Sequence, residues 1–117
     1  MPSHLTHLFM EVASLERARW FWIDALGLEL LEDRGPYIRV GGNGGFSIGI
    51  EQVQAGAPRI DGDEIALRVD DVDATAEQLR ALGVQITQPP HDQPWGDRHA
   101  WLLDPDGRQM SIYSPAA

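Results

Sequence analysis

The sequence predicts an α+β fold built from two tandem modules, each with the element order βαβββ. The first observation is an internal repeat: Val12-Ala13-Ser14-Leu15-Glu16 recurs as Val69-Asp70-Asp71-Val72-Asp73, and Leu26-Gly27-Leu28 recurs as Leu82-Gly83-Val84. The second is the pattern around each copy, in which an alternating apolar run, a helical pattern and a Gly precede another alternating run. Because the repeat interval is close to half the chain, we expect one duplicated domain over residues 1–117 and not a solenoid array.

Composition excludes several classes of function. The chain has 117 residues, no Cys, and only Arg among its nine basic residues, so disulfides, thiolate chemistry and Schiff-base lysines are absent. A net charge of -9 without a basic cluster argues against nucleic acid as a partner. No apolar run approaches the roughly 20 residues of a membrane span, and no leader pattern opens the chain, so we expect a cytoplasmic protein without a membrane partner.

The first module is predicted over about residues 3–53. Alternation over residues 4–12 indicates a strand with one face of Leu8, Met10 and Val12 and another of Leu5, His7, Phe9 and Glu11. Ser14 is a typical helix N-cap and Gly27 a typical end. The expected buried stripe of this helix is Leu15, Ala18, Trp22, Ala25 and Leu26. Three strands are then predicted over residues 28–32, 36–40 and 46–53, with the glycine run 41–45 as a hairpin turn.

The second module, about residues 62–115, follows a linker over about residues 54–61. A strand is predicted over residues 64–69, then a helix from its N-cap Asp71 to Leu82, ended by Gly83. A short strand over residues 84–87 precedes a hairpin of residues 98–103 and 108–113, whose turn is Asp104-Pro105-Asp106-Gly107. Because residues 89–96 contain three prolines, we expect them to form a surface loop that exposes Trp95.

These features together resemble the vicinal oxygen chelate superfamily, the glyoxalase, bleomycin-resistance and extradiol-dioxygenase group. The resemblance rests on the doubled element order, the Leu26-Gly27-Leu28 step after Phe21-Trp22, the Val69-Asp70-Asp71-Val72-Asp73 entry to the second helix and the Asp-Pro-Asp-Gly hairpin. It implies a curled mixed sheet with helices on the convex side and a hollow on the other. Since this scaffold hosts both metalloenzymes and metal-free binding proteins, the resemblance predicts the fold and leaves the function open.

The resemblance also implies four metal-ligand slots, on the first and last strands of each module. Here they hold His7 and Glu64, and then Gly49 and Ser111, where metal-dependent members usually place a carboxylate at one or both. Two ligands are too few to hold a divalent ion, so we favour a charge-assisted hydrogen bond between His7 and Glu64 without metal. A displaced Zn, Ni, Mn or Fe site of His7, Glu51 and Glu64 is the alternative.

Strand alternation predicts the residues that line the hollow. They are Phe9, Tyr37, Arg39, Ser47, Glu64, Ala66, Arg68, His99, Trp101, Ser111 and Tyr113, with Trp95 on a loop that could close over them. Such a surface suits a flat, partly polar organic ligand. The alternative is that this aromatic face packs against a partner subunit. Unpaired strand edges, and the similar length of superfamily members that complete their cavities across a twofold interface, lead us to expect a homodimer.

Three functions follow as hypotheses. The first is a metal-free, cofactor-free binding protein of the bleomycin-resistance type that sequesters an aromatic or cationic compound such as an antibiotic. The second is a metal-dependent lyase, isomerase or dioxygenase of the glyoxalase I or extradiol type. The third is a cofactorless lyase or isomerase whose general base is His7, Glu64 or His99.

Overall fold

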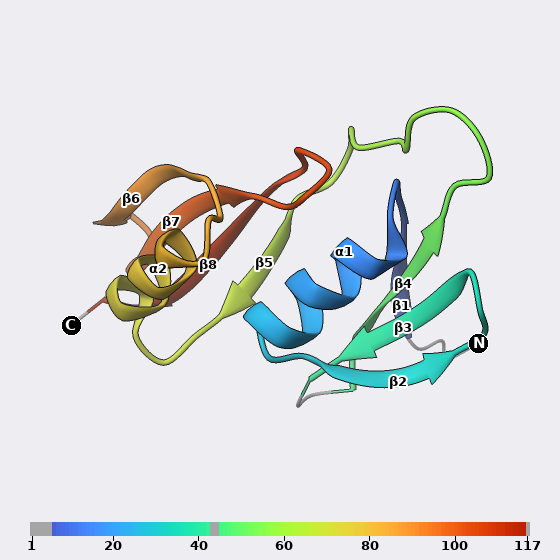
Figure 1. Cartoon of the computed structure of the whole chain (residues 1–117). Coiled ribbons are helices and arrows are strands. Elements are labelled where there is room, and N and C mark those ends of the chain that lie inside the picture. Colours follow the sequence, from blue (N-terminus) through green and yellow to red (C-terminus); the bar gives the residue numbers. More distant parts are fainter. Residues whose placement is uncertain (1–5, 43–44, 117) are drawn as a thin grey trace. The chain divides into compact units, whose positions relative to one another are not determined.

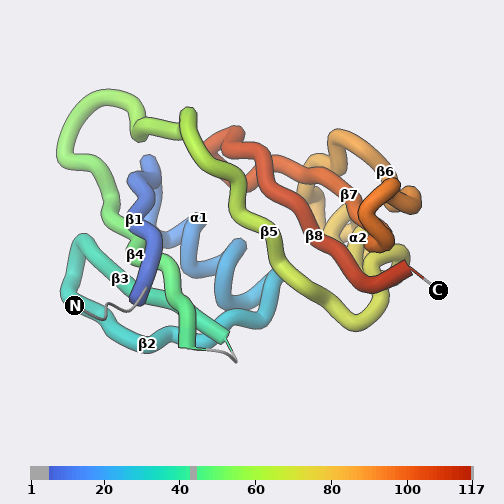
Figure 2. The backbone as a smooth tube through the Cα atoms, turned by 180° about the vertical axis from the view of Figure 1, so that it is seen from behind, coloured from blue at the N-terminus to red at the C-terminus, as the bar shows by residue number. Residues whose placement is uncertain are grey.

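The computed structural model describes residues 6–42 and 45–116. The chain divides between residues 60 and 61 into two compact units, each with one four-stranded sheet and one helical segment (Figure 1). The element order βαβββ occurs once in each unit, as the sequence predicts. Figure 2 traces the chain from the last strand of the first unit, through the connecting residues 53–64, to the first strand of the second.

The first unit contains one mixed sheet in the strand order β1-β4-β3-β2. Strands β1 and β4 are parallel, whereas β3 is antiparallel to both β4 and β2. The elements are β1 (His7–Val12), α1 (Leu15–Arg19), the π-helical segment η1 (Trp20–Ala25), β2 (Glu29–Asp33), β3 (Tyr37–Gly41) and β4 (Ser47–Gln52). The helical segment packs against the sheet face that carries the buried residues Met10, Ile38 and Ile50.

The start of α1 is capped by two side chains. Ser14 accepts a hydrogen bond from the backbone N–H of Arg17 at 3.2 Å, and the Gln52 side-chain oxygen accepts one from that of Leu15 at 2.8 Å. These bonds satisfy N–H groups that have no partner within the helix. Gln52 therefore ties the end of β4 to the beginning of α1.

The buried stripe of the first helix differs from the predicted one. From Trp20 the helix widens into a π-helix, in which Leu26 donates to the carbonyl of Phe21 five residues earlier. Because this winding holds more residues per turn, the neighbours Phe21 and Trp22 both face the core, with exposed fractions of 1% and 0%. Ala25 and Leu26, predicted to be buried, are only half-buried, so that part of the prediction is wrong.

The second unit repeats the arrangement with the strand order β5-β8-β7-β6. Its elements are β5 (Ile65–Arg68), α2 (Val72–Ala81), β6 (Ile86–Asp92), β7 (Asp97–Leu103) and β8 (Gln109–Pro115). As expected, Asp71 caps α2, since its carboxylate accepts from the backbone N–H of Ala74 at 3.0 Å. Helix α2 packs on β6, β7 and β8 through Val72, Ala76 and Leu79.

The segment predicted as a proline-rich loop is largely a strand. Strand β6 extends through Pro89 and Pro90 to Asp92, and only residues 93–96 form the connection to β7. Proline has no N–H to donate, but β6 is an edge strand paired only with β7, where a missing donor is tolerated. The pairing register shifts between Gln88 and His91, which accommodates the two prolines. Trp95 is 60% exposed, as predicted for this connection.

The predicted turn at residues 104–107 is present, whereas the glycine run 41–45 includes residues 43 and 44, which lie outside the described part of the chain. In the Asp104-Pro105-Asp106-Gly107 turn, the Gly107 N–H donates to the Asp104 carbonyl at 3.0 Å, and Gly107 has a φ of 89°. Among the described residues, the helices are too short or too polar for any of them to cross a bilayer.

Candidate functional site

Four ring side chains gather on one face of the second sheet. We call this group the aromatic cluster; its members are Trp95, His99, Trp101 and Tyr113. His99 and Tyr113 are cross-strand neighbours on β7 and β8, and Trp101 lies two residues beyond His99 on the same face. The His99 ring stacks on Tyr113 at 5.0 Å between ring centroids and 12° between planes, and on Trp101 at 5.3 Å and 24°. The alternation of the sequence predicts these three positions, and the structure brings them together.

The imidazole of His99 lies at the centre of this cluster. Its side chain is 9% exposed, and its Nε2 accepts a hydrogen bond from the indole N–H of Trp95 at 3.3 Å. Because an indole nitrogen can only donate, this bond assigns a lone pair to Nε2 and places the proton of the neutral ring on Nδ1. Nδ1 is enclosed and has no hydrogen-bond partner among the described residues. His99 thus orders the rings of Tyr113 and Trp101 by stacking on both, and its Nε2 is already occupied.

Glu64 is held by two donors of its own unit. Its carboxylate accepts from the Trp101 indole N–H at 2.8 Å and from the Gln109 amide at 3.1 Å. These bonds orient Trp101 against His99. The expected bond between Glu64 and His7 joins the two units and stays a prediction.

Sequence reasoning missed two residues beside the cluster. His91 on β6 faces His99 in register and lies 6.0 Å from Trp101 between ring centroids. The nearby prolines predict a loop for this residue, and strand alternation does not apply to a loop. Gln109 lies in the predicted strand 108–113, and its pairing with Glu64 depends on the register between β5 and β8.

The first unit has a different surface on the corresponding face, centred on Gly49. An ideal Cβ built on Gly49 would lie 2.6 Å from the hydroxyl oxygen of Tyr37 and 3.0 Å from its Cε1. The Tyr37 ring therefore crosses β4 directly over Gly49. Phe9 and Arg39 are the in-register neighbours of Gly49 on β1 and β3, so these side chains surround a floor that only glycine permits.

Several other residues predicted to line the hollow are buried or already bonded to neighbouring groups. Ser47 is buried, and its hydroxyl donates to the Thr6 carbonyl at 3.0 Å. His7 is exposed, with its Nδ1 2.9 Å from the Thr6 hydroxyl. In the second unit, Ser111 is buried beside Trp101 and Ala66, whereas Arg68 is exposed opposite Tyr113.

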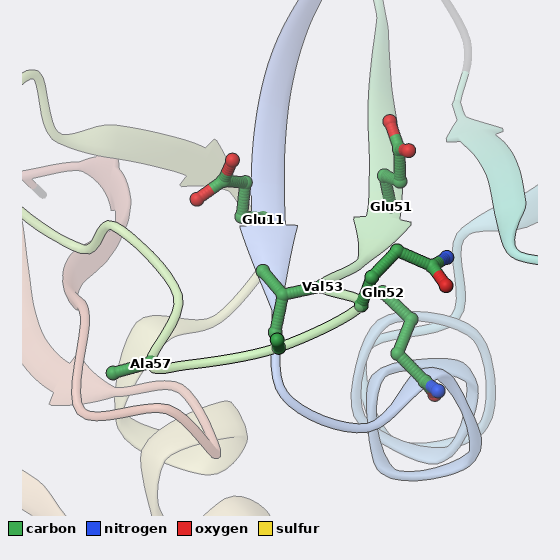
Figure 3. Close-up of a pocket in the computed structure, with 7 residues that line it drawn as sticks. Glu11, Glu51, Gln52, Val53 and Ala57 are labelled. Carbon is green, nitrogen blue, oxygen red and sulfur yellow. The ribbon is translucent and has the colours of Figure 1, made fainter.

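A cavity of about 440 Å³ opens at the ends of β1 and β4 in the first unit (Figure 3). Glu11 and Glu51 are in-register neighbours there, and Glu11 also accepts from the backbone N–H of Arg59 at 3.0 Å. The lining residues are Glu11, Glu51, Gln52, Val53, Gln54, Ala55 and Ala57. Sequence reasoning named Glu51 alone, because the contribution of the connecting segment depends on its path in space.

The last-strand slots do not fit a metal-ligand set. The Tyr37 ring covers the Gly49 slot, and the Ser111 slot holds a buried hydroxyl in place of a carboxylate. Within the part of the chain that the structure describes, no three His, Asp or Glu side chains gather in a group that could hold a metal ion. The displaced site of His7, Glu51 and Glu64 would draw on both units and stays a prediction.

Comparison with known proteins identifies a family that matches most of this chain. A family model described as the Glyoxalase/Bleomycin resistance protein/Dioxygenase superfamily matches residues 4–112. The chain belongs to this superfamily.

Two solved structures resemble the whole chain. One is TnmS3, an antibiotic binding protein from Streptomyces sp. CB03234, with 28% identity, a TM-score of 0.83 and coverage of 98% of both chains. Another is a superfamily member from Sphaerobacter thermophilus DSM 20745, with 26% identity, a TM-score of 0.78 and coverage of 97% of this chain and 98% of that one. The putative glyoxylase CFP32 of Mycobacterium tuberculosis (strain CDC 1551 / Oshkosh) is 46% identical over 48 residues. That match covers 41% of this chain and 18% of the relative.

Proposed function

We propose that this protein binds and sequesters a small aromatic or cationic compound, such as an antibiotic, without a metal or other cofactor. The observation that carries the proposal is the aromatic cluster, in which a neutral imidazole is stacked between Tyr113 and Trp101. Rings already ordered in this way offer a flat ligand stacking surface at little further entropic cost, each contact contributing about 0.5–1.5 kcal/mol beyond area burial. The exposed Trp95 at the rim would cover the bound compound.

Two further observations support a binding role. Tyr37 occupies the slot where a metal-dependent member would carry a ligand, which favours a metal-free site. TnmS3, which is similar over nearly its full length, is an antibiotic binding protein. Two of the candidate general bases are already bonded within the second unit: Nε2 of His99 to Trp95, and Glu64 to Trp101 and Gln109.

The test is a fluorescence screen of planar aromatic antibiotics and metabolites, followed by substitution of Trp101. For a compound that quenches tryptophan fluorescence, Trp101→Ala should weaken binding by about tenfold or more, the effect of truncating a buried anchor ring. Trp20→Ala is the matched control, because Trp20 is an exposed tryptophan on η1, outside the aromatic cluster. A binder whose affinity ignores Trp101 and Trp95 but collapses with His7→Ala would contradict the proposal.

A further inference from the structure

We infer that the first unit carries a second binding surface, at which Arg39 on β3 binds the carboxylate or a similar oxyanion of an aromatic ligand beside the ring of Tyr37. The inference goes beyond the proposed function, whose stacking surface is the aromatic cluster of the second unit. Among the described residues, the guanidinium group of Arg39 has no acceptor.

Arg39 differs from most arginines of this chain. Arg98 bonds to Asp73 and Asp92, Arg108 to the buried Asp104, and Arg19, Arg34 and Arg80 each to one carboxylate. Arg39 is half-buried, yet its side chain makes no hydrogen bond or ion pair with any described residue, and its Nε is enclosed without a partner. Leaving a partly buried charged donor unsatisfied is costly, so a missing acceptor is expected to come from outside the chain.

The acidic neighbours of Arg39 do not supply this acceptor. Glu32 lies opposite Arg39 in the pairing of β2 with β3, but its carboxylate bonds to Arg34 at 3.3 Å. Glu11 and Glu51 lie on the same sheet face as Arg39. Glu51 is two residues further along β4 than Gly49, the residue opposite Arg39, and this spacing is about 7 Å. Although the chain as a whole carries a net charge of -9, these carboxylates leave the positive charge of Arg39 unpaired by any described residue.

The surroundings of Arg39 fit a flat acid. Gly49, its in-register partner, presents bare backbone under the Tyr37 ring, and Phe9 stands on the other side of Gly49 with 45% of its surface exposed. A guanidinium fork binds a carboxylate through two parallel hydrogen bonds, and the two rings can contact the attached aromatic system. An aromatic carboxylate satisfies both features at once.

The experiment compares three probes that share one ring system and differ in charge: 2-naphthoate, 2-naphthamide and 2-naphthylmethylammonium. Isothermal titration of the full chain should give an affinity for 2-naphthoate at least about tenfold above that for the neutral amide, the effect of hydrogen bonds to a charged group. The ammonium probe should bind most weakly. Binding of 2-naphthoate should also shift the backbone amide resonance of Gly49.

Substitution of Arg39 assigns the preference to its side chain. Arg39→Gln should abolish the difference between 2-naphthoate and the amide, and Arg39→Lys, which keeps the charge but not the fork, should weaken 2-naphthoate alone. Arg17→Gln is the matched control, since it removes the same charge from an exposed helical position whose side chain forms no ion pair with another described residue. Equal binding of all three probes, tightest binding of the ammonium probe, or an acid preference that survives both Arg39 variants would overturn the inference while leaving the proposed function in place. Failure of all three probes to bind would overturn the inference as well.

Discussion

At the residue scale, Asp104 stabilises the β7–β8 hairpin more directly than any predicted site residue does. Its side chain is almost fully buried, and one carboxylate oxygen accepts from the backbone N–H groups of Asp106 at 3.0 Å and Arg108 at 2.8 Å. The other oxygen pairs with the buried guanidinium of Arg108. The Asp104 side chain thus accepts hydrogen bonds from the backbone of the turn and also neutralises a buried cation.

We predict that Asp104→Ala lowers the free energy of unfolding by about 3–5 kcal/mol, because it leaves a buried arginine without its counter-ion. Urea denaturation followed by tryptophan fluorescence measures the change. The control is Glu77→Ala, which breaks the exposed pair between Glu77 and Arg80 and should cost less than about 1 kcal/mol. A similar, small loss in both variants would contradict this role for Asp104.

The sequence predicts part of the aromatic cluster but not the contact that Trp95 makes in it. Alternation along β7 and β8 places His99, Trp101 and Tyr113 on one face, and the structure stacks them there. The bond from Trp95 to His99 could not be derived in this way, because Trp95 lies outside a strand and its direction depends on a four-residue connection. That bond determines the tautomer of His99.

At the scale of elements, an exposed ion pair in each unit links a helix to the sheet. Arg19, the last residue of α1, pairs with Asp33 at the end of β2, and Arg98 of β7 pairs with Asp73 in the first turn of α2. A hydrogen bond from the Gly35 N–H, together with Arg19, lowers the pKa of Asp33 below its ordinary value. Hydrogen bonds from Arg98 lower the pKa of Asp73 in the same way.

These shifts predict a loss of stability in acid. A carboxyl group whose pKa is lower in the folded state stabilises the fold above its unfolded pKa of about 4, and this contribution disappears as the pH falls through the folded pKa. The free energy of unfolding should therefore decrease below about pH 4, and less steeply in a variant carrying Asp33→Asn and Asp73→Asn. Denaturation midpoints between pH 2.5 and pH 6 measure this dependence. The paired change Asp61→Asn and Asp63→Asn, at exposed connecting positions, should leave the slope as in the wild type.

Strand β6 shows how an element can contradict its own sequence pattern. Pro89 and Pro90 predict a loop because proline cannot donate to a sheet. Strand β6 nevertheless pairs with β7 through Gln88 and His91, because an edge strand needs donors on one side only and the irregular register skips the two prolines. Edge position is a property of the sheet, so the sequence of the segment could not reveal it.

At the scale of the whole molecule, we predict a homodimer. Each sheet has two edge strands. In the first unit, the apolar side chains of Phe9 and Leu31 are exposed. Unpaired edges and exposed apolar side chains favour association with a second copy, which would add rings to each binding surface. Light scattering coupled to gel filtration should report about twice the mass of 13.0 kDa at micromolar concentration. A monomeric mass under these conditions would remove this prediction.

The sequence by itself determined the doubled βαβββ order, the caps at Ser14 and Asp71, the Asp-Pro-Asp-Gly turn and the faces of the central strands. These features depend on neighbours within a few residues and on a period of two or 3.6, which a sequence displays directly. The burial of Phe21, the path of β6 through two prolines and the position of Tyr37 over Gly49 follow from the three-dimensional packing. So does the lack of an acceptor for Arg39 among the described residues. Each of these depends on register, helical winding or side-chain direction between segments distant in the chain, and such relations are fixed by packing and not by local pattern.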